Sequence, residues 1–251
     1  MSIQSIHSTK PIVHCITNYV VTNFTANGLL AVGASPIMAD EIQEMHDIVQ
    51  IANGVLINIG TLNTRTVDAM ILAGQAANKK GIPVVLDPVG IGASKYRKQT
   101  VEQLLQHVQF TAIRCNAGEL AALAEIKVAS RGVDAGDVSF EIEEAAKQVA
   151  TRYKTIVAIS GVEDLITDGT TVHIINGGHA WMEQITGAGC LLSALTTASI
   201  ASHTDALQSV ITIHKDYKQV AETAHHHSNG IGDFQMQILN QLQQMSFGGI
   251  K

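Results

Sequence analysis

The segment GVLINIGTLNTRTVDAMILAGQAANKKGIPVVLDP, residues 54–88, carries the signals of a strand, a helix and a second strand in succession. Asn63 or Thr64 is suited to cap the start of the helix, and Gly81 ends it after Lys80. The predicted elements are the strand 54–59, the helix that runs to residue 80, and the strand 83–86, which ends at Asp87-Pro88. The first strand is rich in apolar residues, which indicates that it is buried.

The same alternation of strand-length and helix-length patterns continues along the rest of the chain. Further strands are predicted at 11–17, 111–114 and 155–160, with a hairpin joining 165–167 to 171–175. Further helices are predicted at 20–32, from the strand 111–114 through 124, and at 142–153, 188–201, 206–226 and 233–245. Residues 127–138 are predicted to form an exposed loop. This order predicts an α/β fold, with a mostly parallel central sheet, helices on both of its faces, and a single domain over residues 1–251.

The composition of the chain narrows its class and its partners. In 251 residues, 46% are hydrophobic and 15% are charged, so a large core can form. A net charge of −6 without a Lys/Arg cluster disfavours a nucleic-acid partner and an anionic membrane surface. The polar start MSIQSIHSTK does not resemble a signal peptide, and no apolar run reaches the length of a membrane span. Three widely separated cysteines favour a reducing, cytoplasmic location.

Candidate site residues lie at or after the ends of several of the predicted strands. In open parallel sheets, ligands bind at the carboxyl ends of the strands, so these residues are expected to share one edge. The residues are Asn18, Gly60, Asp87, Arg114, Asn116, Glu119 and Ser160. Asp87 and Glu119 are the best candidates for Mg²⁺ carboxylates, and the planar guanidinium of Arg114 is the best candidate for binding phosphate. Alternatively, the carboxylates cap helices and Arg114 forms a surface salt bridge.

The segment TGAGC, residues 186–190, is followed by a helix of small apolar residues. Small residues allow backbone N–H groups near a helix N-terminus to converge on an anion, such as a phosphate. This position also lowers the pKa of a thiol, so Cys190 is a candidate base or nucleophile. The alternative is a tight turn that contains a small buried cysteine. The segment is not a Walker loop, because no Gly-Lys-Ser/Thr follows it.

Two further features have ordinary structural interpretations. His225, His226 and His227 are consecutive on a predicted helix, so their side chains point in different directions and would chelate a metal poorly. A solvated helix end is the preferred interpretation of these three residues. Met38, in the segment GASPIM, has the flexibility of a residue that fills a gap in a core.

Six segments, taken in order, resemble the hydroxyethylthiazole kinase family over nearly the whole chain. They are VHCITNYVVTNFTANGLLAVGASPIM (13–38), LINIGTL (56–62), PVVLDPVGIGAS (83–94), IRCNAGEL (113–120), SGVEDLITDG (160–169) and ITGAGCLLSAL (185–195). The resemblance implies a ribokinase-like three-layer sandwich. The chain departs from the family pattern at Cys115, where glycine is more usual, and at Ser160, where threonine is common. His179-Ala180-Trp181 also replaces a more usual His-Pro stretch.

The resemblance implies roles on the acceptor side of the reaction. Met38 and Gly187 are expected to contact the thiazole, and Asn18 is expected to line the same pocket. Cys190 occupies the position at which the wider ribokinase-like group usually has an aspartate base, so it is the expected catalytic residue. The hypothesis for the acceptor is the primary hydroxyl of 4-methyl-5-(2-hydroxyethyl)thiazole, in thiamine biosynthesis or salvage.

The resemblance also implies roles on the donor side. Arg114 and Ser160 are expected to bind ATP, and Asp87 and Glu119 are expected to lie near Mg²⁺ and the phosphates. The family is expected to form a homotrimer with its sites at subunit interfaces. We therefore formulate the hypothesis that one pocket takes Asn18 from one subunit and Cys190 from the next.

Three alternative functions are compatible with parts of this pattern. A related kinase could act on hydroxymethylpyrimidine or another small alcohol, although the segment that ends at Met38 favours the thiazole. A hydrolase or transferase could use Cys190 as a nucleophile, but this chemistry needs a basic partner that no sequence signature identifies. A non-catalytic binding protein would not need Asp87, Arg114, Glu119 and Cys190 together.

Overall fold

A computed structural model describes residues 2–125 and 135–248 of the chain. Its centre is an eight-stranded sheet with the order β2-β1-β3-β4-β5-β6-β7-β8. Neighbouring strands are parallel from β2 to β6, and β7 and β8 pair antiparallel at one end. The strands are β1 (Ile12–Ile16), β2 (Ser35–Ile37), β3 (Gly54–Asn58), β4 (Val84–Asp87), β5 (Ala112–Asn116), β6 (Ile156–Ser160), β7 (Asp164–Thr167) and β8 (Val172–Ile175).

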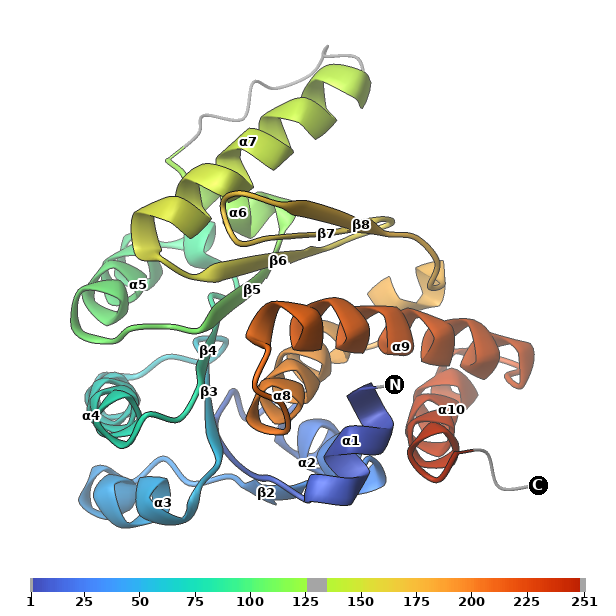
Figure 1. The fold of residues 1–251 in the computed structure, drawn as a ribbon, viewed down its shortest axis with the longest axis horizontal. Helices are drawn as coiled ribbons and strands as arrows, with labels where there is room; N and C mark the ends of the chain where they lie inside the picture. The colour runs from blue at the N-terminus through green and yellow to red at the C-terminus, as the bar shows by residue number, and fades with distance from the viewer. Residues whose placement is uncertain (1, 126–134, 249–251) are drawn as a thin grey trace.

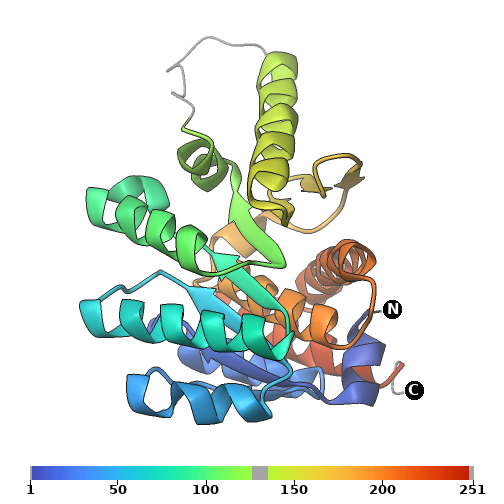
Figure 2. The same ribbon diagram turned by 60° about the vertical axis from the view of Figure 1, so that its left-hand side comes forward.

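Helices cover both faces of the sheet. On one face lie α1 (Ser2–Thr9), α2 (Thr22–Ala31), α8 (Ala188–Ala201), α9 (Ala206–His226) and α10 (Ile231–Ser246). On the other face lie α3 (Met45–Ile51), α4 (Thr64–Lys80), α5 (Lys95–His107), α6 (Ala117–Leu123) and α7 (Ala135–Tyr153). Short 3₁₀ turns are η1 (Ile42–Glu44), η2 (Ile91–Ala93) and η3 (Ala180–Glu183). The two views agree on these three layers, which confirms the predicted α/β sandwich (Figure 1, Figure 2).

The ends of α4 form through the predicted local chemistry. The Asn63 side chain accepts a hydrogen bond from the backbone N–H of Thr66, and the Thr66 side chain accepts one from the Asn63 backbone. This reciprocal arrangement satisfies two donors at the start of the helix. Gly81 ends the helix with φ 77°, a left-handed conformation that favours glycine. The strand-helix-strand unit of residues 54–88 is thereby confirmed.

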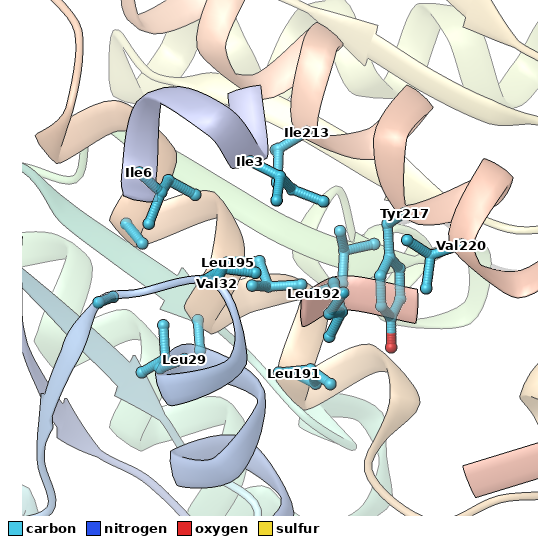
Figure 3. Close-up of a cluster of buried hydrophobic side chains, with 14 of the residues drawn as sticks. Ile3, Ile6, Leu29, Val32, Leu191, Leu192, Leu195, Ile213, Tyr217 and Val220 are labelled. Atoms are coloured by element: carbon cyan, nitrogen blue, oxygen red, sulfur yellow. The ribbon is translucent and has the colours of Figure 1, made fainter. Parts of the chain in front are cut away.

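The core on one face of the sheet is built around α8. Leu191, Leu192 and Leu195 pack against side chains from three neighbouring helices (Figure 3). These partners are Ile3 and Ile6 of α1, Leu29 of α2 and Val32 at its end, and Ile213, Tyr217 and Val220 of α9. Since α8 is small and apolar on all sides, it can be buried between the sheet and other helices, as the sequence predicts.

Some elements differ from the sequence prediction. Four short or polar elements, α1, β2, α3 and α5, were not predicted. In α1, only Ile3 and Ile6 supply large apolar side chains to the core, and the buried Asp216 accepts a hydrogen bond from the Ile3 backbone. Of the predicted loop 127–138, residues 135–138 belong to α7, and residues 127–134 lie outside the described part of the chain. The hairpin of β7 and β8 is confirmed.

Cys15, Cys115 and Cys190 are all free thiols. Across residues 2–125 and 135–248, no helix combines the length and apolar character that crossing a membrane requires.

Candidate active site

The parallel strands bring the predicted polar residues to one edge of the sheet. Asn18 follows β1, Asp87 ends β4, and Ser160 ends β6. Arg114 lies within β5, and Cys190 lies in the first turn of α8. Asn58 contacts Asn18, Asp87 and Cys190. Arg114 lies beside Asp87 and Ser160, and Asn18 lies beside Cys190. The expected convergence on one edge is therefore confirmed.

Asn58, the last residue of β3, is at the centre of this cluster. Its Nδ2 group lies 2.8 Å from Oδ2 of Asp87 and 3.3 Å from Sγ of Cys190. Its Oδ1 accepts hydrogen bonds from Nδ2 of Asn18 at 2.9 Å and from the backbone N–H of Gly60 at 2.9 Å. With an exposed fraction of 1%, the side chain has no freedom to turn away. Asn58 therefore fixes the relative positions of Asn18, Asp87 and Cys190.

Asp87 is fully buried, and its two carboxylate oxygens have different environments. Oδ2 accepts hydrogen bonds from Asn58 and from the Ser193 hydroxyl of α8, each at 2.8 Å. Oδ1 is buried without a hydrogen-bond partner, 3.8 Å from Nη1 of Arg114. Burial raises the pKa of Asp87 to about 6, although Arg114 opposes this shift. One oxygen of this carboxylate is thus available to a cation or a proton.

Arg114 lies beside Asp87, and its hydrogen-bonding capacity is only partly used. Nη2 donates to the Ser160 hydroxyl, while Nε is buried without a partner. Burial opposes the charge, but the nearby Asp87 and Glu119 outweigh it and raise the pKa of Arg114. The guanidinium is therefore a permanent, largely buried cation with unused donors, which suits the binding of an anionic group.

Glu119 has a structural function that accounts for both of its oxygens. Oε2 accepts a hydrogen bond from the Asn116 backbone N–H, and the Asn116 side chain accepts one from the Glu119 N–H. This capping box begins α6. Oε1 accepts from the backbone N–H of Gly90, in the loop after β4. Glu119 therefore contributes negative charge near Asp87 while it holds two loops of the edge together.

The first turn of α8 faces the same cluster. The hydrogen bonds of the helix begin with the Leu191 N–H, which donates to the Gly187 carbonyl. The N–H groups that precede Leu191 in the first turn therefore have no acceptor within the helix. Gly187 has φ 93°, a left-handed conformation. A Cβ at Gly189 would lie 2.7 Å from Nη1 of Arg114, so this glycine permits the guanidinium to approach the helix. Unpaired N–H groups beside an arginine are the arrangement that an anion site requires.

The thiol of Cys190 differs from the expectation for a helix N-terminus. Burial, with a further contribution from Asp87, raises its pKa to about 11. The side-chain donors of Asn58 and Asn18, together with Arg114, act in the opposite direction but are weaker. The expectation of a lowered pKa is therefore wrong for this site, because the thiol is buried and also lies near the carboxylate of Asp87.

Asn18 and Cys190 come together within a single chain. Nδ2 of Asn18 lies 3.5 Å from Sγ of Cys190, and both side chains contact Asn58. The hypothesis that one pocket takes these two residues from different subunits is therefore wrong for this pair. The chain returns from β8 through η3 to place the start of α8 beside the end of β1, a proximity that the sequence alone does not reveal.

Met38 lies directly after the carboxyl end of β2, and Gly187 directly precedes α8. Met38 directly follows the edge strand β2, and its partly buried side chain packs on the core shared by α2 and α8. The fully buried His14 of β1 lies 2.9 Å, through Nε2, from the carbonyl of Ala39, the residue after Met38. A Cβ at Gly187 would lie 2.8 Å from Val21. Gly187 thus lies against the start of α2, whereas Met38 lies at the carboxyl end of β2, next to β1.

Two residues of this cluster, Asn58 and Ser193, are not among the predicted site residues. The sequence prediction includes Asn58 only as part of a buried strand, although an amide at the last position of such a strand is a signal for a site. Ser193 lies one turn after Gly189, and its hydroxyl reaches Asp87. No local signal distinguishes Ser193 from the other small residues of α8.

Two features lie outside this cluster. A hollow of about 540 Å³, lined by residues such as Gly81, Thr111 and Asp168, lies near the amino ends of β4, β5 and β6. Within the described residues, no group of three metal-binding side chains is found, and the consecutive histidines end α9. The interpretation of His225, His226 and His227 as a metal site therefore has no support.

Comparisons with known proteins agree with this architecture. A model described as the hydroxyethylthiazole kinase family matches residues 3–247. The chain is 50% identical to hydroxyethylthiazole kinase of Lysinibacillus sphaericus, over 99% of this chain and 98% of that protein. The solved hydroxyethylthiazole kinase protein of Pyrococcus horikoshii has a TM-score of 0.89 and 33% identity, covering 97% and 91% of the two chains.

The fold is also similar to that of a more distant protein. A ribokinase-like superfamily protein from Enterococcus faecalis has a TM-score of 0.67 at 10% identity, covering 95% of this chain and 88% of that chain. This similarity concerns the fold alone. The predicted ribokinase-like three-layer sandwich is therefore confirmed.

Proposed function

This chain belongs to the hydroxyethylthiazole kinase family, and we propose that it transfers the γ-phosphoryl group of ATP to the primary hydroxyl of 4-methyl-5-(2-hydroxyethyl)thiazole. The family membership makes it a phosphotransferase that acts in thiamine biosynthesis. The use of ATP, the requirement for Mg²⁺ and the roles of individual residues are the proposal. The products are the thiazole phosphate and ADP.

The observation that carries the proposal is the arrangement of Arg114 and Asp87 under the first turn of α8. Arg114 offers unused donors, Asp87 offers an unpaired oxygen, and the helix offers unpaired N–H groups. A transferring phosphoryl group needs positioning and stabilisation of its charge more than covalent assistance. In our proposal, Arg114 and Ser160 bind the phosphates of ATP, and the N–H groups from Gly187 to Cys190 hold the transferring group.

Asp87 fits a magnesium ion better than Glu119 does. Its buried Oδ1 has no partner in the structure, whereas both oxygens of Glu119 accept hydrogen bonds from backbone groups. Mg²⁺ is commonly held by one or two carboxylates, by water and by substrate phosphates. We therefore assign Asp87 as the carboxylate that holds Mg²⁺, and Glu119 as a second, more remote charge. When bound, Mg²⁺ neutralises charge on the phosphates.

The acceptor binds on the side of the cluster formed by β1, β2 and the start of α8. Met38, Gly187 and Asn18 are assigned to the thiazole, in agreement with their positions at this side of the edge. A partly buried methionine suits an aromatic heterocycle, because its thioether is flexible and polarisable. The hydroxyethyl group would then extend toward Cys190, which contacts Asn18.

The proposed reaction is a direct in-line transfer. The acceptor oxygen forms a bond to the γ-phosphorus, the bond from that phosphorus to the β–γ bridging oxygen breaks, and ADP leaves. The hydroxyl proton passes to Sγ of Cys190, which must be a thiolate at that moment. Since the transition state is loose, the hydroxyl loses its proton late, when it has become acidic. Donors from Asn18 and Asn58 favour the thiolate, and neutralising Asp87 removes one cause of its high pKa.

The contacts of Cys190 argue against a hydrolase that uses this thiol as a nucleophile. Such an enzyme needs a base beside the sulfur to generate the thiolate. The described hydrogen-bonding neighbours of Sγ are the amides of Asn18 and Asn58, which cannot act as bases.

We further propose a cytoplasmic homotrimer of single-domain subunits, as the family resemblance implies. Tyr19 and Val20, which directly follow Asn18, are 81% and 60% exposed. Large apolar side chains exposed at the rim of a site suit contact with a neighbouring subunit. Light scattering coupled to size exclusion tests the assembly, and a mass of one subunit at micromolar concentration would contradict it.

Identification of the product tests the proposed reaction. Purified protein is incubated with ATP, Mg²⁺ and the thiazole, and the products are analysed by ³¹P NMR and mass spectrometry. A phosphate monoester on the thiazole, formed together with ADP, is expected. Free inorganic phosphate with an unmodified thiazole would identify an ATP hydrolase instead.

A further inference from the structure

The ammonium group of Lys218 is held in a cage of backbone oxygens. This residue of α9 is 8% exposed. Its Nζ lies 3.1 Å from the carbonyl of Gly161, 2.9 Å from that of Val162 and 3.1 Å from that of Gly177. A carboxylate oxygen of Asp164 lies 3.1 Å from the same nitrogen. An ammonium group has three N–H donors, so this cage exhausts its capacity.

The charge of Lys218 is balanced within the cage, so it is not available to a ligand. Asp164 accepts hydrogen bonds from the Gly161 N–H at 3.1 Å and contacts Nδ1 of the buried His214 at 2.8 Å. Burial opposes ionisation of Asp164, but His214 and Lys218 outweigh it and lower the pKa of this carboxyl. A buried lysine with a satisfied carboxylate and three carbonyls organises backbone rather than binding substrate charge.

The three carbonyls belong to two segments that border the proposed nucleotide site. Gly161 and Val162 directly follow Ser160, whose hydroxyl contacts Arg114. Gly177 lies in the segment after β8 that leads through η3 to the anion-binding start of α8. The ammonium group of Lys218 therefore connects the turn after β6 to the segment after β8 through hydrogen bonds.

Other residues of α9 hold the same connection. The Tyr217 hydroxyl donates to the carbonyl of Ala188, in the first turn of α8, at 3.0 Å. Glu222 accepts a hydrogen bond from the backbone N–H of Gly178 at 2.9 Å. Helix α9, which lies beside β7 and β8 (Figure 1), therefore contacts three backbone segments around the site. Lys218 is the only one of these three side chains that joins two of the segments.

We propose that Lys218 is a positioning residue for the nucleoside triphosphate, acting as a tethered cation that sets the spacing between the Gly161–Val162 turn and the Gly177 segment. This inference rests on the proposed use of ATP at Arg114 and Ser160. The side chain of Val162 is 85% exposed at this turn. It therefore offers an apolar contact whose position depends on the ammonium cage. Thiazole binding, on the opposite side of the cluster, does not depend on it.

The test is Lys218→Ala, with Lys215→Ala as the matched control, because Lys215 is exposed on the same helix. The expected result for Lys218→Ala is a KM for ATP at least tenfold higher, with the KM for the thiazole changed less than twofold. n-Propylammonium replaces the deleted atoms and should restore the KM for ATP. Tetramethylammonium, which has charge but no N–H donors, should not. Lys215→Ala should resemble the unmodified chain.

A second readout does not depend on activity. Trp181 is the only tryptophan and follows Gly177 by four residues. Its fluorescence should shift in Lys218→Ala without any ligand, and n-propylammonium should reverse the shift. If Lys218→Ala does not fold, the double variant Asp164→Asn/Lys218→Met removes both charges together and should show the same selective loss for ATP.

The inference is overturned if the KM values for ATP and thiazole rise by the same factor, or if n-propylammonium restores neither KM nor fluorescence. For the double variant, an unchanged KM for ATP overturns it. Calorimetric titration with ADP separates this outcome from failure of the proposed function. If ADP binds the unmodified chain in an Arg114-dependent manner but binds Lys218→Ala equally well, only the inference about Lys218 fails. If ADP does not bind the unmodified chain, the proposed use of ATP fails.

Discussion

Arg114 and Asp87 lie on adjacent strands, with 3.8 Å between Nη1 of the guanidinium and Oδ1 of the carboxylate. This separation exceeds that of a direct hydrogen bond, and both groups keep unused bonding capacity at these and neighbouring atoms. Two buried opposite charges that do not fully satisfy each other are poorly explained as a stabilising pair. Our proposed function explains them better, because Arg114 would bind a phosphate and Asp87 would hold the cation that accompanies it.

Arg114→Ala should raise the KM for ATP much more than the KM for the thiazole. Loss of a charge-assisted contact costs ~1.5–3 kcal/mol, which corresponds to roughly ten- to hundredfold. Arg114→Lys keeps the charge but loses the planar fork, so an intermediate effect is expected. Arg152→Ala serves as the control, because Arg152 is exposed in the last turn of α7, which leads into the amino end of β6. An unchanged dependence on ATP in folded Arg114→Ala would place this residue outside the site.

Gly189→Ala should impair the enzyme by displacing Arg114 while leaving the fold intact. The added Cβ would lie 2.7 Å from Nη1, at the flexible end of the arginine side chain, which can move away. The expected result is a higher KM for ATP with little change in melting temperature. Gly232→Ala is the matched control, because nothing lies within 4 Å of its added Cβ. If Gly189→Ala had normal kinetics, the close packing of Arg114 against α8 would have no role in binding.

The fold could be predicted more completely than the site. Alternating apolar strands and capped helices such as α4 are local signals, so the three layers could be inferred from residues 54–88 and their continuation. Asn58 was missed because its role depends on Asp87 and Cys190, which are 29 and 132 positions away. The pKa of Cys190 was mispredicted for the same reason, since burial and Asp87 are tertiary effects.

The concentration of free Mg²⁺ needed for half-maximal activity should increase as the pH falls through about 6. Burial raises the pKa of Asp87 to about 6, so the carboxylate is ionised at pH 8 and mostly protonated at pH 5.5. A proton and a cation compete for the same carboxylate. Simple competition predicts that the apparent dissociation constant for free Mg²⁺ is roughly fourfold higher at pH 5.5 than at pH 8. The measurement is a titration of free Mg²⁺ at saturating ATP and thiazole, and a constant that does not vary with pH would contradict the assignment of Asp87.

Iodoacetamide should label Cys190 faster than Cys15 or Cys115, because Cys190 is only partly buried whereas the other two are buried. Its pKa of about 11 implies that labelling accelerates about tenfold per pH unit from pH 7 to 9, without a plateau. ATP or thiazole should slow the reaction. Peptide mass spectrometry identifies the labelled residue, and Cys190→Ser is the control. A plateau near pH 7.5 would mean that the thiol is activated in the resting site, contrary to its buried position beside Asp87.

The central claim is tested most directly by ADP release with four acceptor conditions: hydroxyethylthiazole, hydroxymethylpyrimidine, ribose and no acceptor. The same purified protein is assayed with ATP and Mg²⁺ in a coupled reaction, at matched acceptor concentrations. The proposed function predicts rapid ADP release with the thiazole, at a rate well above the other three conditions. An equal rate with the pyrimidine would contradict the thiazole assignment, and a rate with the thiazole no higher than without acceptor would contradict the kinase itself.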